Sequence, residues 1–143
     1  MIRSTQLARL VDYWQTLTPS TVEVIKTVYT EDAYFRDPFN EVTGIEKIRH
    51  IFADMFVRMD EPQFVITETL EEAHGALLIW NFTFRLKSLK PELMRRIHGS
   101  SHIRFAADGR VQYHRDYWDA AGELYEQLPV VGSVMRWLKK RVG

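Results

Sequence analysis

The sequence predicts an α+β fold in which N-terminal helices pack against a curved antiparallel sheet of four to five strands. Up to about residue 59, apolar residues recur every three or four positions, which is the period of an amphipathic helix. From Pro62 onward they alternate with polar residues, which is the period of a strand with one covered face. Strands that follow one another through short turns pair antiparallel, so the helices are expected to cover one face of their sheet.

Three helices are predicted before the strands. The second begins at a Ser20 or Thr21 cap and runs to Val28, and the third follows Gly44 and extends to about residue 56. The first ends at Pro19, which cannot continue a helix. Its apolar stripe consists of Leu7, Leu10, Val11, Trp14 and Leu17. All three helices thus have one apolar side for a shared core.

Four long strands are predicted in the second half of the chain. Turns are expected at residues 74–75, 87–92 and 107–109, and Ala-Asp-Gly at 107–109 is a strong hairpin signal. Alternation of apolar and polar side chains marks the strands themselves, at 64–70, 78–85, 101–105 and 113–118. The sequence therefore predicts a meander rather than a wound parallel sheet.

Length and composition favour one domain over residues 1–143, with a core at about 5–120 and a helical extension at about 120–143. Nineteen basic and nineteen acidic residues cancel, which argues against a nucleic-acid partner. The chain has no cysteine, so disulfides and thiolate chemistry are excluded. No signal peptide or membrane-spanning segment is evident, and a cytoplasmic location is expected.

The C-terminal region is predicted as a helical piece at 120–127, a break at Pro129 and Gly132, and a last helix from Ser133 to Val142. The last helix carries four basic residues and no acidic one beside Trp137 and Leu138. This pattern is typical of a helix that makes weak contact with an anionic membrane surface or an acidic partner. The alternative is that its apolar residues pack on the domain or on a second subunit.

Three local motifs in this order resemble the nuclear-transport-factor-2-like superfamily, in particular its SnoaL-like branch. They are Tyr-Phe-Arg-Asp-Pro at 34–38, Gly-Ile-Glu-Lys-Ile at 44–48 and His-Arg-Asp-Tyr-Trp-Asp at 114–119. The resemblance covers about residues 5–120. It implies a cone-shaped fold with a deep apolar pocket, as in ketosteroid isomerase, polyketide cyclases and limonene epoxide hydrolase. Because the same fold also serves non-enzymes, it does not by itself assign an activity.

The resemblance also implies roles for individual residues. Asp37 stands where ketosteroid isomerase has its general base, and Tyr13 falls where that enzyme has its oxyanion-hole tyrosine. Ser101 replaces the protonated aspartate of that site, which argues against steroid isomerisation. Asp116 matches the water-activating base of limonene epoxide hydrolase. The Arg and second Asp of that enzyme are replaced by Trp-Asn-Phe at 80–82, so its full triad is absent.

Two carboxylates are the candidate catalytic groups on chemical grounds. Asp37 has Tyr34, Phe35 and Phe39 nearby, and apolar surroundings raise the pKa of a carboxyl group toward that of a general acid or base. The alternative is an Asp-Pro turn in which the carboxylate accepts backbone N–H groups. For Asp116, the alternative is a buried ion pair that only fixes its strand.

The side chains next to Asp116 complete the predicted site. His114, Asp116 and Trp118 point to one face of a strand, where His114 could move a proton or be structural. Trp80, Phe82 and Phe84 are expected to form an aromatic wall that binds an apolar ligand. The alternative is that these side chains are part of the hydrophobic core. We predict no metal site, because the histidines lack ligand spacing, and no cofactor, because nucleotide-binding motifs are absent.

The predicted function is cofactor-free acid–base catalysis on a small apolar molecule, of isomerase, cyclase, dehydratase or epoxide hydrolase type. Two alternatives stay open. One is a module that binds such a ligand unchanged, and the other is an interaction protein. The resemblance also implies a homodimer formed through the outer face of the sheet, where Ile79, Asn81 and Thr83 are expected.

Overall fold

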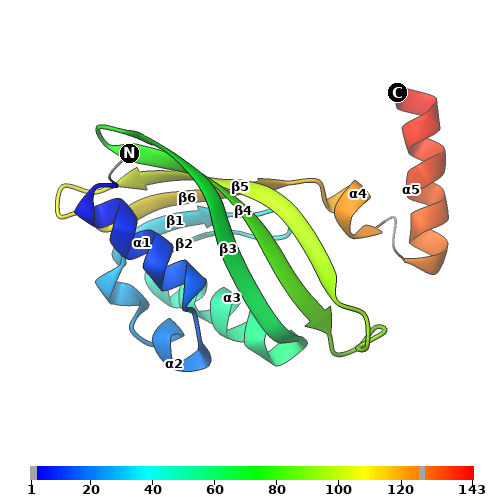
Figure 1. Ribbon diagram of the computed structural model, residues 1–143, viewed down its shortest axis with the longest axis horizontal. Coiled ribbons are helices and arrows are strands. Elements are labelled where there is room, and N and C mark those ends of the chain that lie inside the picture. The colour runs from blue at the N-terminus through cyan, green and yellow to red at the C-terminus, as the bar shows by residue number, and fades with distance from the viewer. Residues whose placement is uncertain (1–2, 126–127) are drawn as a thin grey trace.

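The computed structural model describes residues 3–125 and 128–143, and it confirms the α+β class. Helices and strands follow the expected order, with the helices first and the long strands after them (Figure 1). The elements are α1 (Thr5–Gln15), α2 (Pro19–Val22), the 3-10 helix η1 (Ile25–Thr27), β1 (Tyr29–Arg36), β2 (Glu41–Thr43), α3 (Ile45–Arg58), β3 (Met59–Glu72), β4 (Gly75–Leu86), β5 (Arg95–Phe105), β6 (Val111–Trp118), α4 (Ala120–Glu123) and α5 (Pro129–Val142).

The sheet has six strands in the order β2-β1-β6-β5-β4-β3, so the expected count of four to five was too low. It is also mixed, because β1 runs parallel to β6, with Tyr34 beside Tyr113. The segment before the third helix supplies two strands, whereas the sequence pattern predicts only a short extended piece at 34–37 that ends at Pro38. β1 already starts at Tyr29, and the chain returns after Pro38 as β2. The remaining neighbours pair antiparallel as predicted.

The second predicted helix is mostly absent. Thr18, not Ser20 or Thr21, is the cap of α2, and its hydroxyl accepts the backbone N–H of Thr21. The helix ends after four residues, and a short 3-10 turn leads into β1. Four of the seven residues from 22 to 28 are β-branched valine or isoleucine, and one is threonine, which lowers helix propensity. The third helix forms as expected after Gly44.

The hydrophobic core lies between the helices and the concave face of the sheet. Figure 1 shows α1 and α3 on the same side of the curved strands. α1 buries the predicted stripe residues Leu7, Leu10, Val11 and Trp14, and α3 buries Ile48 and Phe52. Long strands bend around them, so the covered face forms the wall of a cone.

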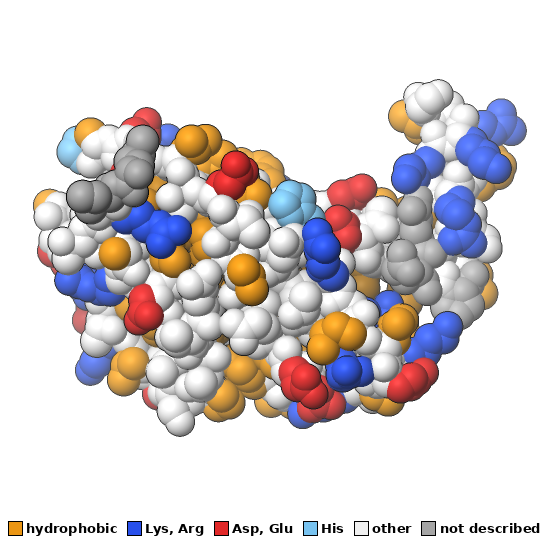
Figure 2. All heavy atoms as spheres, in the orientation of Figure 1, with side chains coloured by type: hydrophobic (Ala, Val, Ile, Leu, Met, Phe, Trp, Pro, Cys, Tyr) orange, Lys and Arg blue, Asp and Glu red, His pale blue; other side chains and the backbone are white. Residues whose placement is uncertain are grey.

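The C-terminal helix begins at Pro129 rather than Ser133, and Gly132 lies inside it rather than breaking it. Of the helical piece predicted at 120–127, residues 120–123 form α4, and residues 126 and 127 lie outside the described part of the chain. α5 stands apart from the sheet in Figure 1, and Figure 2 shows its basic side chains gathered along it. Val130 is 77% exposed and Trp137 is 56% exposed. Contact with a membrane or an acidic partner stays a prediction.

No helix in the part of the chain that the structure describes has the length and apolar character needed to cross a bilayer.

Candidate functional site

A cavity of about 470 Å³ lies between α3 and the concave face of the sheet. Its wall is mainly aromatic, and the predicted residues Trp80, Phe82, Phe84 and Trp118 all line it. The first three lie at alternate positions of β4, so all three point inward. The rings of Phe82 and Phe84 stack with centroids 4.9 Å apart. The shape and composition of such a wall suit a flat or extended apolar molecule, which it would contact mainly through surface area.

Asp116 and Asp37 are acidic groups on the wall of this cavity. The side chain of Asp116 is 18% exposed and accepts two hydrogen bonds at the same oxygen, Oδ1. One comes from the Ser101 hydroxyl at 2.5 Å, and the other joins His114 Nε2 at 2.6 Å. Among the described residues, nothing donates to Oδ2. This second oxygen is therefore the one that can accept a proton from a bound molecule.

Two indole groups determine where the protons of this network lie. The Trp80 indole N–H can only donate, and it donates to the Ser101 oxygen at 2.8 Å. Ser101 therefore uses its own proton for Asp116. On the other side, Trp14 Nε1 donates to the Tyr29 hydroxyl at 3.0 Å. Tyr29 in turn lies 2.7 Å from His114 Nδ1.

The same reasoning assigns the tautomer of His114. Because the Tyr29 oxygen already accepts from Trp14, its proton goes to His114 Nδ1. The neutral imidazole then carries its proton on Nε2 and donates it to Asp116. Two series of hydrogen bonds, one starting at the Trp14 indole and one at the Trp80 indole, thus both end at the Asp116 carboxylate. Both donors hold Oδ1 of this carboxylate in a fixed position.

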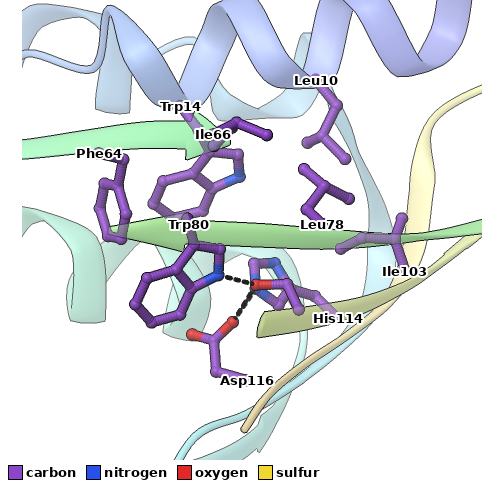
Figure 3. A pocket seen from close by; sticks show the side chains of 10 residues that line it. Leu10, Trp14, Phe64, Ile66, Leu78, Trp80, Ile103, His114 and Asp116 are labelled. Atoms are coloured by element: carbon purple, nitrogen blue, oxygen red, sulfur yellow. Dashed lines mark hydrogen bonds and ion pairs between the residues drawn. The ribbon is translucent and has the colours of Figure 1, made fainter. Parts of the chain in front are cut away.

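A second hollow of about 20 Å³ lies deeper, between His114 and the residues Leu10, Leu78 and Ile103 (Figure 3). It is too small for an organic ligand. The ligand volume of the site is therefore the larger cavity in front of Asp116.

Gly99 allows the indole of Trp80 to lie close to β5. A Cβ at this position would be 2.5 Å from Cη2 of Trp80, and no real side chain tolerates so short a contact. Gly99 also pairs with both Trp80 and Trp118 in the sheet. The glycine thus leaves room for the indole that orients Ser101.

Asp37 forms the turn that the alternative interpretation described, and it also faces the cavity. Its Oδ1 accepts the backbone N–H groups of Phe39 and Asn40 at 2.8 and 2.7 Å. Burial raises the pKa of Asp37, these backbone hydrogen bonds lower it, and the charge of Asp116 raises it again. The net shift is upward. Asp37 and Asp116 are therefore two carboxyl groups with different surroundings in the same cavity.

Tyr13 does not reach the cavity. Its hydroxyl donates to the backbone carbonyl of Thr21 at 2.9 Å, and burial raises the pKa of its phenol. The tyrosine that contacts the site is Tyr29, which sequence reasoning missed because it treated this position as the end of a helix. One signal was available: Tyr29, Ala33 and Phe35 are the buried residues on one side of a strand that begins earlier than expected.

No group of three or more His, Asp or Glu side chains with metal-binding geometry occurs among residues 3–125 and 128–143.

A curved sheet with helices packed on its concave face is an NTF2-like fold, and several solved structures share this class of fold. A protein of ketosteroid isomerase-like fold from Catenulispora acidiphila, solved with trimethylamine, has a TM-score of 0.72 at 14% identity, covering 86% of this chain and 92% of that one. A protein named a SnoaL-like polyketide cyclase from Shewanella putrefaciens has a TM-score of 0.71 at 20% identity, covering 88% and 100%. An LEH-like epoxide hydrolase from M. tuberculosis has a TM-score of 0.67 at 14% identity, covering 94% and 93%.

Within that class, the chain belongs to the SnoaL-like domain family, which it matches over residues 9–114. No curated protein sequence matches it significantly. At identities of 20% or less, the structural likeness establishes the fold and not the reaction.

Replacing Tyr29 with Phe is expected to lower the free energy of unfolding by about 2–4 kcal/mol. The change leaves two buried groups, the Trp14 indole N–H and His114 Nδ1, without a partner. Tyr34→Phe is the matched control, because the Tyr34 hydroxyl bonds to Glu41 at the surface, and its effect should stay within about 0.5 kcal/mol. Urea unfolding measures both. Equal effects would contradict the buried hydrogen bonds of the Tyr29 hydroxyl to Trp14 and His114.

Asp37→Asn is expected to stabilise the protein at pH 7, and the gain should shrink as the pH falls toward the ordinary carboxyl pKa of 3.8. A raised pKa means that ionised Asp37 destabilises the folded state at higher pH, and Asn removes that cost while its amide oxygen still accepts both backbone bonds.

Asp108→Asn is the control of opposite sign. The backbone N–H of Arg110 lowers the pKa of Asp108, so ionisation stabilises the fold above that pKa. This variant should lose stability at pH 7, and the loss should fade only as the pH falls below the ordinary carboxyl pKa of 3.8. Urea unfolding at pH 7, at about pH 4 and at about pH 2.5 compares the two variants with wild type. A loss of stability for Asp37→Asn at pH 7 would refute the assignment.

Proposed function

We propose that this SnoaL-like protein is a cofactor-independent acid–base catalyst acting on a small, largely apolar molecule. One observation carries the proposal: a carboxylate with one free oxygen, Asp116 Oδ2, lies on the wall of an aromatic cavity while a directed hydrogen-bond network holds its other oxygen. The reaction types that this supports are isomerisation, cyclisation, dehydration and epoxide hydrolysis.

In this proposal Asp116 accepts a proton either from the bound molecule or from a water molecule that attacks the bound molecule. The His114 and Ser101 donors hold the carboxylate in one orientation before the reaction. Asp37, with its raised pKa, is the group that returns a proton on the same cavity wall. The aromatic wall limits water in the cavity, which strengthens each of these interactions.

The positions of Tyr13 and Ser101 favour proton transfer or water activation over enolate stabilisation of the ketosteroid isomerase type. Tyr13 spends its hydroxyl proton on Thr21, and Ser101 spends its own on Asp116. Neither is therefore available to an oxyanion in the cavity. The second candidate function is a module that binds the apolar molecule without changing it, which the large aromatic wall alone would support.

Asp116→Asn is expected to lower turnover by at least about 100-fold while ligand affinity changes little, because the amide cannot accept the proton. The assays are hydrolysis of limonene oxide and exchange of the α-protons of 2-tetralone in D₂O, followed by NMR. Asp12→Asn, an exposed carboxylate on α1, is the control and should act as wild type. If Asp116→Asn alters only affinity and wild type exchanges no protons, the binding module is the correct function.

We also propose that the protein acts as a homodimer in the cytoplasm, paired through the outer face of the sheet. Ile79, Asn81 and Thr83 lie on that face of β4 and are half-buried within one chain. Light scattering should then give twice the mass of one chain, and Ile79→Arg should halve it. A wild-type protein that stays monomeric at about 100 μM would overturn the dimer proposal.

A further inference from the structure

Arg95 is a buried cation on the concave face of the sheet. It is the first residue of β5 and is 8% exposed, whereas its neighbour Arg96 is exposed. Residues two apart on a strand share a face, so Arg95 shares the inward face with Ile97, which lines the cavity. Its direct partner across the sheet is Phe84, another lining residue. Arg95 thus lies on the inward face of the sheet next to two lining residues, although it is not itself one of the residues that line the cavity.

This guanidinium has no counter-charge within the described part of the chain. No ion pair or hydrogen bond of Arg95 is formed there, and its Nε is buried without any acceptor. A buried and unpaired charge is costly, and buried polar atoms in folded proteins almost always have a partner. The apparent gap is explained if the partner is a ligand that the cavity receives.

The arginine that does line the cavity, Arg58, is already paired, because it bonds to Asp54 at 2.8 Å. Within the described residues, Arg95 therefore offers one unpaired positive charge on this face of the sheet, which matches a group with one negative charge better than a phosphate with two. A planar guanidinium also presents two parallel N–H donors that fit a carboxylate.

The distance along the sheet indicates the shape of the ligand. Asp116 pairs with Ser101, and Arg95 precedes Ser101 by six residues on the same strand. At about 3.3 Å per residue, the two positions are separated by about 20 Å of strand. A molecule that touches both side chains must therefore be elongated, with its apolar middle against Phe82 and Phe84.

We propose that Arg95 binds the carboxylate of an elongated apolar acid, whose opposite end is presented to Asp116. This inference rests on the proposed function, since it names the substrate class of the same cavity. It adds an anionic end, which the sequence did not suggest, to a ligand expected only to be apolar. In this arrangement Asp37 and Asp116 face the reacting end of the substrate, and Arg95 binds its anionic end.

The test compares decanoate with decan-1-ol, an uncharged molecule of the same chain length, by isothermal titration calorimetry. Arg95→Met should weaken decanoate binding by about 10-fold or more, because hydrogen bonds to a charged group are lost. Its binding of decan-1-ol should change by less than about twofold, which also shows that the variant is folded. Arg96→Met, the exposed neighbour, is the matched control and should bind both as wild type does.

A second measurement uses the unliganded proteins. Removing an unpaired buried charge should raise the melting temperature of Arg95→Met by at least about 2 °C, with no such rise for Arg96→Met. The inference is overturned if Arg95→Met keeps wild-type affinity for decanoate, loses both ligands equally, or melts at a lower temperature.

The outcomes separate this inference from the proposed function. If decan-1-ol binds to wild type and Arg95→Met has no selective effect on decanoate, the carboxylate inference fails and the apolar pocket stands. If neither molecule binds to wild type, the ligand cavity and the carboxylate inference fail together.

Discussion

The site depends on the chain of hydrogen bonds that delivers protons to Asp116. A carboxylate beside aromatic rings is destabilised by the loss of water, so it needs donors of fixed direction. The two indoles, Trp14 and Trp80, supply that direction because an indole N–H cannot accept. Through Tyr29 and Ser101 they leave Asp116 as the common acceptor, and the catalytic proposal follows from this constraint.

The sheet topology brings these groups together from distant parts of the chain. The parallel pairing of β1 with β6 sets Tyr29 opposite Val111, and from there the Tyr29 hydroxyl reaches the ring of His114, 85 residues further along. The antiparallel pairing of β5 with β6 places Ser101 opposite Asp116. A slip of one residue in either register would turn these side chains to the other face. The strands therefore carry the geometry of the site, and the helices supply its cover.

Charge is distributed unevenly along the cavity. Asp37 and Asp116 share its acidic part, where their mutual repulsion contributes to the raised pKa of Asp37. Arg95 lies on the same face of β5, six residues before Ser101, which is the strand partner of Asp116. In the proposed complex, this separation favours one orientation of a ligand with unlike ends, since the reversed orientation would place a carboxylate against carboxylates.

The sequence by itself determined the fold class, the helical and strand periods, the aromatic wall of β4 and the shared face of His114, Asp116 and Trp118. These follow from local alternation, because a strand has a period of two whatever its partners are. Only the tertiary structure decided the sixth strand, the exchange of Tyr13 for Tyr29, and the role of Ser101 as a donor to Asp116. Those features depend on which strands pair and in what register, and hydrogen-bond partners that are many residues apart leave no periodic trace in the chain.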